Sequence, residues 1–565
     1  MPLATHPAPE RHRRVTHRAL PLGVLAAVAL VGGLVVGSAF QSGSERVAQR
    51  FTQAWARADY GAMRRLLSES SRSRYPGADF KRAYENARAT STAVQIRADE
   101  PSGTRRGAVR VPLAVRTRAF GTIRGEVALS VSGETIEWEP GLAFPGLPEG
   151  GRLTRETKVP KRAKILSADG LTLAEGPAQA RSSPLDGVGA SIAGGMEVPD
   201  GADGTDRTRS YARGFPADTP VGTSGLERAL QPQLEGRPGG TLSAGKRVLA
   251  RSEPRAAGAV RSTIDTRVQA AADTALAGRF GGIAAIEPKT GAILALAGVA
   301  FSAPQPPGSV FKIVTTTAAL EAGKVTPSKE FPVQTEAVID GVPLSNANGA
   351  ACGGSFKDSF ANSCNSVFAP LGVEVGAKRL VATAERFGFN QPPTIAGALA
   401  SSIPAADEIS GPLDLGSSAI GQGRVLATPL QMASVGQTIA NDGRRLTPTL
   451  LASSSSKRTR VTSARTANTV TRLMEGVVDY GTGTAAAIEG VRVAGKTGTA
   501  ELGDTRGPEA EFDLADPTNT DAWFTAFAPA GRPRIAVAVL LVRAGAGGAV
   551  AAPTAAPVLV AGLKR

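Results

Sequence analysis

The segment PPGSVFK, residues 306–312, places a serine hydroxyl three residues ahead of a lysine amine. Pro306, Pro307 and Gly308 end an irregular stretch, and the pattern that follows predicts a helix with Ser309 in its first turn. Positions i and i+3 share one helix face, so a desolvated lysine of lowered pKa could take the proton of a serine nucleophile. Free N–H groups at the helix start could stabilise an oxyanion. The alternative is a capping serine followed by a solvated lysine.

The rest of the chain narrows the chemistry available to this pair. The only histidines are His6, His12 and His17. A Ser-His-Asp triad and a His-ligated metal are therefore excluded beyond them, and acid–base work falls to Lys, Tyr, Asp or Glu. Cys352 and Cys364 are too few for a Cys-only zinc site, so we expect no metal and no cofactor.

Ser-x-x-Lys alone is a weak signal, because it occurs three times. Besides Ser309/Lys312 the matches are Ser243/Lys246, in a glycine-rich stretch, and Ser454/Lys457, in a run of serines. Both of these are predicted to lie in loops, where the two side chains share no helix face.

Lys-Thr-Gly occurs twice. The copy at 289–291 lies at the tip of a predicted hairpin over 281–298 and is explained by the turn. The copy Lys496-Thr497-Gly498 follows an alternating strand pattern and precedes Thr499. A lysine and two hydroxyls on a strand edge would hold a substrate carboxylate, and the edge backbone could pair with an extended peptide.

Ser363-Cys364-Asn365 is the one Ser-x-Asn of the sequence, in a helical context. Taken alone, it could be an ordinary polar helix end. In the oxidising environment outside a cell, Cys364 could pair with Cys352, or both could remain buried thiols, and sequence does not decide between these.

The N-terminus predicts a membrane segment. Residues 20–40 are uncharged and apolar over about the length of a spanning helix, and four arginines precede them. We expect a cytoplasmic tail at 1–18, a single anchor at 19–40 and everything later outside the cell. The alternative is a cleavable signal peptide, since Gly37-Ser38-Ala39 offers small residues at a cleavage point.

The composition sets the remaining bounds. Lys plus Arg number 64 against 49 Asp plus Glu, but the basic residues are scattered, which favours anionic lipid headgroups or envelope polymers over nucleic acid. Residues 43–150 predict an amphipathic helix followed by antiparallel strands, a small α+β domain. Residues 151–260, rich in Gly, Pro, Ser and Arg, predict an extended connecting module, and 261–565 a mixed α/β domain.

Within these regions the patterns predict particular elements. In the first, strands are expected at 108–117, 122–133 and 135–141. In the last, a helix is expected over 262–280, capped by Ser262 or Thr263.

The three motifs, in their order, resemble the SxxK, SxN and KTG of the serine acyltransferases that include penicillin-binding proteins and serine β-lactamases. Class B, monofunctional penicillin-binding proteins are the most similar. Further segments are similar to recurrent stretches of that family, at 263–269, 288–296, 419–433, 477–486 and 522–529.

The resemblance implies a multidomain α+β architecture. A membrane-anchored chain would carry a nuclear transport factor-like α+β domain at 43–150 and an extended β-rich pedestal, of the dimerisation-linker type, at 151–260. The C-terminal transpeptidase/serine β-lactamase-like α/β domain would occupy 261–565.

The resemblance also implies roles for the site residues. Ser309 would attack the carbonyl of the penultimate D-alanine of a peptidoglycan stem peptide, with Lys312 accepting its proton. Ser363 would relay that proton to the leaving D-alanine, and Asn365 would orient Lys312 and the donor amide. The terminal carboxylate would be held by Lys496, Thr497 and Thr499, and the N–H groups of Ser309 and Thr499 would form the oxyanion hole.

The activity implied is that of a D,D-transpeptidase that crosslinks stem peptides and binds β-lactams covalently. A glycosyltransferase domain is not expected after residue 17, so a separate polymerase would be a partner. The alternatives are a hydrolase, either a D,D-carboxypeptidase or a β-lactamase, and a non-catalytic β-lactam sensor or scaffold.

Overall fold

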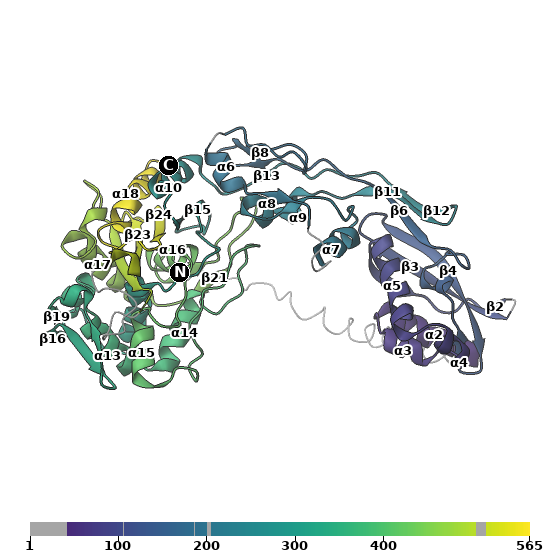
Figure 1. The fold of residues 1–565 in the computed structure, drawn as a ribbon, viewed down its shortest axis with the longest axis horizontal. Helices are drawn as coiled ribbons and strands as arrows, with labels where there is room; N and C mark the ends of the chain where they lie inside the picture. Colours follow the sequence, from purple (N-terminus) through teal and green to yellow (C-terminus); the bar gives the residue numbers. More distant parts are fainter. Residues whose placement is uncertain (1–41, 106, 186, 200–204, 504–515) are drawn as a thin grey trace, which may run out of the picture. The chain divides into compact units, whose positions relative to one another are not determined.

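The computed structural model describes residues 42–105, 107–185, 187–199, 205–503 and 516–565. They form two compact units (Figure 1). The first contains the chain up to Pro160 together with Asp200–Asp218 and Arg237–Arg255. The second contains Lys161–Pro199, Thr219–Gly236 and Ala256–Arg565.

The first unit packs helices against an antiparallel sheet of order β1-β3-β4-β5, with β2 paired to β3. A second sheet has the order β12-β11-β6. The helices are α2 (Gly43–Ala56), α3 (Tyr60–Arg65), α4 (Glu69–Arg74), α5 (Gly77–Ser91) and α7 (Thr205–Arg213). The strands are β1 (Ala93–Ala98), β2 (Thr104–Arg105), β3 (Ala108–Thr117), β4 (Thr122–Ser132), β5 (Thr135–Glu137), β6 (Leu153–Lys158), β11 (Gly239–Ala244) and β12 (Arg247–Ser252).

Local sequence explains these elements well. Ser42 and Glu45 form a reciprocal capping box at the start of α2. Strand β3 coincides with the predicted 108–117, and β4 ends one residue before the predicted 122–133. Along β3 every second residue is buried against the helices, which is the alternation that identified it. Only Thr135–Glu137 of the third predicted strand is a strand, because a 3-10 turn follows at Pro140–Ala143.

Residues 151–260 contribute to both units. The part within the second unit contains α6 (Val188–Ala193), α8 (Gly225–Ala229), α9 (Gln231–Leu234), β7 (Ile165–Leu166), β8 (Thr172–Ala174), β9 (Met196–Glu197), β10 (Val221–Gly222) and β13 (Val260–Arg261). A buried carboxylate connects three segments of this part of the chain. Glu227 accepts hydrogen bonds from Arg162 and Arg181, both at 2.7 Å through Nε. Because the charge is paired on both oxygens, its burial is compensated.

The second unit is built on an antiparallel sheet of order β15-β14-β24-β23-β22, so β22 is an edge strand. The strands are β14 (Gly281–Ile286), β15 (Ile293–Gly298), β22 (Ala494–Glu501), β23 (Thr520–Ala528) and β24 (Ile535–Leu541). The hairpin predicted over 281–298 is confirmed as β14 and β15. Because side chains alternate between the two faces of a strand, β14 and β24 contribute residues to two separate hydrophobic cores. Ile283 and Val539 pack with α10 and α18, and Ala284 and Ala538 lie in the core that includes α11 and α16.

The helices of this unit are α10 (Thr266–Leu276), α11 (Lys312–Glu321), α12 (Phe356–Ala361), α13 (Asn365–Val375), α14 (Ala377–Phe387), α15 (Gly411–Ala419), α16 (Pro429–Ala440), α17 (Ala464–Asp479) and α18 (Ala551–Leu563). Three small antiparallel pairs accompany them: β16 (Glu330–Gln334) with β19 (Cys352–Ser355), β17 (Glu336–Ile339) with β18 (Val342–Ser345), and β20 (Arg444–Leu446) with β21 (Arg458–Arg460).

The predicted cap of the helix at 262–280 was wrong. Helix α10 begins at Thr266, and its cap is Asp265, whose carboxylate accepts from the N–H groups of Arg267 and Val268. Ser262 is instead engaged with Leu166, and Thr263 donates to the carbonyl of Ile293. These long-range bonds keep the chain extended as far as Ile264, so the helix begins later in the sequence than predicted.

The membrane prediction falls on residues 19–40, which lie outside the described residues. Among the helices of the described ranges, none combines the length and the apolar character needed to cross a bilayer.

Candidate active site

Ser309 lies in a 3-10 turn, η2 (Gly308–Phe311), that leads directly into α11 at Lys312. Gly308 has φ +52°, and a Cβ there would come within 2.8 Å of the Thr499 carbonyl oxygen. Glycine is therefore required for the turn to rest on strand β22. This contact brings the serine of the first motif to the strand of the third.

The capping explanation of Ser309 was wrong. The residue at the N-cap position of the turn is Pro307, and α11 has no side-chain cap. The lysine is not solvated either, because Lys312 is wholly buried. The Ser309 hydroxyl is half-buried and is not hydrogen-bonded to any other side chain in the described ranges.

Lys312 points at the second motif. Its Nζ donates to the backbone carbonyl of Ser363 at 2.7 Å and to Asn365 Oδ1 at 2.7 Å, and it lies within hydrogen-bond distance of Ser363 Oγ, at 3.3 Å. The ring of Phe368 lies beneath it, with Nζ 5.2 Å from the ring centroid. The lysine is therefore held in one orientation by two acceptors, a hydroxyl group and an aromatic face.

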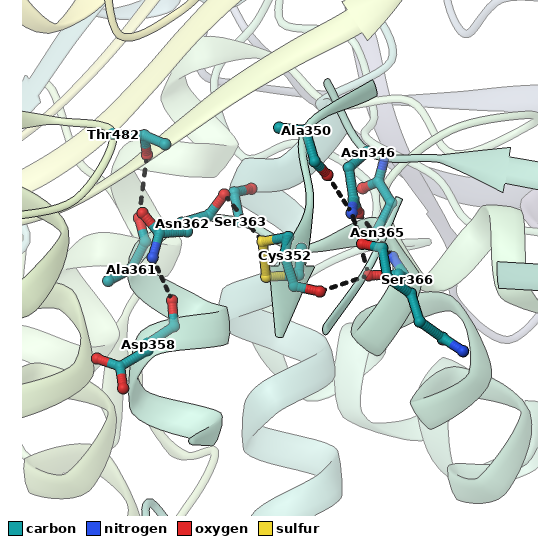
Figure 2. The surroundings of a disulfide bond; sticks show 12 residues. Asn346, Ala350, Cys352, Asp358, Ala361, Asn362, Ser363, Asn365, Ser366 and Thr482 are labelled. Carbon is teal, nitrogen blue, oxygen red and sulfur yellow. Dashed lines mark hydrogen bonds between the residues drawn. A yellow bond between two sulfur atoms is a disulfide. The ribbon is translucent and has the colours of Figure 1, made fainter. Parts of the chain in front are cut away.

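Ser363 lies in the turn between α12 and α13, and Asn365 is the first residue of α13 (Figure 2). Ser363 has φ +63°, a left-handed conformation that few non-glycine residues adopt. The turn aims both the carbonyl and the hydroxyl of Ser363 at Lys312. Backbone strain of this kind concentrates at functional sites, where surrounding contacts hold it in place.

Those surrounding contacts come from the 345–346 segment, which sequence reasoning missed. Asn365 Nδ2 donates to the Ser345 carbonyl at 2.8 Å, which leaves Oδ1 facing Lys312. Asn346 is buried, accepts from the Ser366 N–H at 2.9 Å and donates to the Ala350 carbonyl at 2.9 Å. Figure 2 shows the Asn346–Ala350 bond beside the turn.

Cys352 and Cys364 form a disulfide (Figure 2). Cys364 stands between Ser363 and Asn365, and Cys352 begins strand β19. The Ser366 hydroxyl also donates to the Cys352 carbonyl at 3.3 Å. The turn is thus tied to β19 both covalently and by a hydrogen bond.

Lys496 completes the cluster from strand β22. It is wholly buried, and its Nζ donates to Ser363 Oγ at 2.8 Å and to the Thr497 carbonyl at 3.2 Å. Ser363 Oγ therefore lies between two lysine amines. The other residues of this strand segment face different partners: Thr497 shares a hydrogen bond with Thr482, and Thr499 Oγ1 accepts from the Gly547 N–H at 3.2 Å.

Gly498 allows the turn and strand to approach. A Cβ at Gly498 would meet the Pro307 carbonyl oxygen at 2.9 Å and Val310 Cγ1 at 3.1 Å. Thr482, a second residue that sequence reasoning left without a role, donates to the Ala361 carbonyl through its N–H at 3.1 Å and through its hydroxyl at 3.3 Å, and Figure 2 shows the hydroxyl bond. It connects the helix before Ser363 to the strand of Lys496.

The electrostatics of the cluster are unusual. Burial, and then the nearby Lys496 charge, hold the pKa of Lys312 well below the usual value for lysine. Burial alone lowers the pKa of Lys496 to about 7. In the described part of the chain, neither amine forms an ion pair with a carboxylate. Such a site has a neutral amine available as a base and a second amine available for an anionic group.

The other motif copies are not assembled in this way. Lys289 and Thr290 are exposed in the β14–β15 turn, as predicted. Ser454 and Lys457 lie in a loop, also as predicted, whereas Ser243 was wrongly placed in a loop and lies on strand β11. The described residues contain no cluster of three or more His, Cys, Asp or Glu side chains able to hold a metal.

Comparison with known proteins agrees with this assembly. The sequence profile of the penicillin binding protein transpeptidase domain matches residues 281–560. The peptidoglycan D,D-transpeptidase PbpA of Mycolicibacterium smegmatis is 34% identical over 60% of this chain and 80% of its own length. Stage V sporulation protein D of Bacillus subtilis is 32% identical over 44% of this chain and 40% of its own.

Solved structures give the same result. The ceftriaxone acyl-enzyme of penicillin-binding protein A from Mycobacterium tuberculosis superposes with a TM-score of 0.57 at 28% identity, covering 72% of this chain and 99% of that one. The mixed α/β second unit thus has a transpeptidase fold. The chain belongs to the penicillin-binding protein transpeptidase family, in its class B.

Proposed function

We propose that this chain is a peptidoglycan D,D-transpeptidase whose nucleophile is Ser309. The observation that carries the proposal is the pair of buried amines, Lys312 and Lys496, on either side of Ser363 Oγ, next to the turn that holds Ser309. The PbpA relatives are named as peptidoglycan D,D-transpeptidases, which agrees with this activity.

In the acylation step, neutral Lys312 accepts the Ser309 proton as Oγ bonds to the carbonyl carbon of the penultimate D-alanine. Lys312 gives this proton to Ser363 as Ser363 passes its own proton to the departing nitrogen, the amide bond breaks, and D-alanine leaves. Asn365 keeps Lys312 oriented. The Ser309 and Thr499 N–H groups are assigned to the oxyanion, since their segments meet at Gly308.

Substrate binding is assigned to strand β22. Protonated Lys496 with Thr497 and Thr499 would hold the terminal carboxylate, and the edge backbone would pair with the stem peptide. The nitrogen of an amine from a second stem would then bond to the ester carbon, the bond from this carbon to Ser309 Oγ would break, and a proton of the amine would return to Ser309 Oγ. A β-lactam would acylate the same oxygen, and the solved penicillin G acyl-enzyme complex of penicillin-binding protein A from M. tuberculosis supports this reaction.

The wider architecture completes the proposal. The helices and antiparallel sheet of the first unit support a nuclear transport factor-like domain at 43–150. The apolar run at 20–40 supports a single anchor that leaves the second unit outside the plasma membrane. Glycan polymerisation is then assigned to a separate glycosyltransferase.

The test is a reconstituted reaction of the purified chain with a synthetic stem peptide ending in D-Ala-D-Ala and a second stem as acceptor. We expect free D-alanine and a crosslinked dimer in mass spectra, both absent for Ser309→Ala. Release of D-alanine without dimer, at all acceptor concentrations, would favour a carboxypeptidase instead.

A further inference from the structure

Away from the active site, a cavity of about 210 Å³ opens in the second unit beside the loop 388–401 that follows α14. The first turns of α16 and the segment 445–448 form its other walls. Its described lining includes none of the active-site residues. The space is several times that of a water molecule, which occupies about 30 Å³ in the liquid. It is therefore large enough for a small organic ligand.

The charges of this cavity are all of one sign. Arg445 and Lys457 line it, and no carboxylate belongs to the described lining. Arg445 donates one side-chain bond, to Gln391 Oε1 at 2.7 Å, and its Nε is buried without an acceptor in the described ranges. Burial lowers the pKa of the Arg445 guanidinium. A partly buried cation that lacks a counter-ion is stabilised by an anion of matching shape.

The remaining lining is aliphatic. Ile395 and Leu430 are nearly buried, whereas Leu399 keeps 52% of its surface exposed at the loop. An exposed leucine beside nearly buried aliphatic side chains is a surface that a ligand's hydrocarbon part would cover.

The start of helix α16 does not supply the anion site. The Thr428 N–H donates to Ser401 Oγ at 3.0 Å, the Leu430 N–H to the Ala300 carbonyl at 2.9 Å, and the Gln431 N–H to Thr428 Oγ1 at 3.2 Å. The intervening residue is Pro429, which has no N–H. With these amides already engaged, the charged donors of the described lining are the side chains of Arg445 and Lys457.

We propose that this cavity is a binding site for a small aliphatic carboxylate. Its carboxylate pairs with Arg445 and Lys457, and its hydrocarbon part packs on Ile395, Leu399 and Leu430. The planar guanidinium suits a carboxylate, which can accept two parallel hydrogen bonds. This site is separate from the one that carries the proposed transpeptidation.

The test uses N-acetyl-L-leucine as probe, titrated against the full chain by saturation-transfer NMR, with N-acetyl-L-leucinamide as its uncharged twin. We expect saturable binding of the acid and binding of the amide that is weaker by about tenfold or more. Arg445→Gln should weaken the binding of N-acetyl-L-leucine by a similar factor. Leu399→Asp, which alters an exposed residue and threatens the fold less, should do the same.

Two controls assign the binding to this cavity. Arg458→Gln changes an exposed arginine outside the lining and should leave the affinity unchanged. Lys496→Met removes a cation of the active site and should also leave it unchanged. The proposal is overturned if the acid shows no saturable binding, if acid and amide bind equally, or if Lys496→Met abolishes binding that Arg445→Gln retains. It is also overturned if inorganic phosphate binds and the acid does not.

Discussion

The tripeptide Lys-Thr-Gly stands at two places in the second unit, in two different environments. Lys289 and Thr290 are exposed in the β14–β15 turn, where Thr290 donates to Glu287 at 2.6 Å and Lys289 reaches Asn441 Oδ1 at 3.5 Å. Lys496 and Thr497 are buried on the edge strand β22.

The difference lies in what the fold places opposite each copy. Lys289 and Thr290, the copy in the turn, are exposed and have ordinary polar neighbours. The strand copy faces Ser363 and a second buried lysine, and burial lowers the pKa of Lys496 to about 7. Identical residue types thus acquire different chemistry from tertiary packing, and each experiment below acts on that contrast.

The largest effect is expected from exchanging the two lysines for methionine. Lys496→Met removes the proposed carboxylate partner and a donor to Ser363, so penicillin acylation should slow by about 10³-fold. Lys289→Met should leave the rate within about twofold, because its amine is exposed. Stopped-flow acylation with a fluorescent penicillin measures both rates. Equal slowing by the two variants would remove the distinction.

The next-largest effect on the acylation rate is expected from Asn346, which supports the Ser363 turn opposite Lys496-Thr497-Gly498 on strand β22. Asn346→Ala removes bonds to Ala350 and Ser366, so the turn that carries Ser363 and Asn365 should loosen. Displacing reacting groups by about 1 Å costs about 10²-fold in rate. The matched change at the turn copy is Asn441→Ala, with little expected effect. A normal acylation rate for Asn346→Ala, in a folded protein, would show that Asn346 does not position the site.

A smaller effect is expected from pH. Protonated Lys496 is the form that holds a carboxylate, and its pKa of about 7 means that this form is lost above neutrality. The second-order acylation constant should therefore decline by about tenfold per pH unit at alkaline pH. The lowered pKa of Lys312, caused by its burial, favours the neutral form of that amine over the same pH range.

Lys496→Arg should abolish that alkaline decline, since a guanidinium stays protonated. Lys289→Arg serves as the matched control and should retain it. An unchanged profile in Lys496→Arg would assign the decline to another group.

The smallest effect is on stability. The Cys352–Cys364 bond joins residues separated by 12 positions beside the strand copy. Replacing both by alanine should cost up to about 3 kcal/mol of the free energy of unfolding and lower the thermal midpoint of the second unit by about 5 °C. The first unit contains no cysteine and provides an internal reference in calorimetry. A shift of both transitions together would contradict this assignment.

Sequence predicted well those features that depend on local periodicity. Strand β3 and the β14–β15 hairpin follow from alternation and turn residues. The resemblance carried by the three motifs also implied which side chains the fold would bring together, and the structure places Lys312, Ser363 and Lys496 in one hydrogen-bonded cluster.

The features that sequence did not predict depend on long-range contacts. Asn346 and Thr482 have no local signature, because the contacts that connect them to the site are to Ser366, 20 positions later, and to Thr497, 15 positions later. The N-cap of α10 is Asp265 and not the predicted Ser262, because the Ser262 hydroxyl is bonded to the Leu166 carbonyl, 96 positions earlier. Strand pairing across such separations overrides local propensity.

The central claim, that Ser309 is the acylated nucleophile, is tested most directly by covalent labelling with a fluorescent penicillin followed by peptide mass spectrometry. Ser454→Ala, in the Ser-x-x-Lys copy that lies in a loop, should label like the wild type, with the adduct on the peptide containing Ser309. Ser309→Ala should not label. A covalent adduct on Ser309→Ala, or an adduct mapped to another serine of the wild type, would contradict the account.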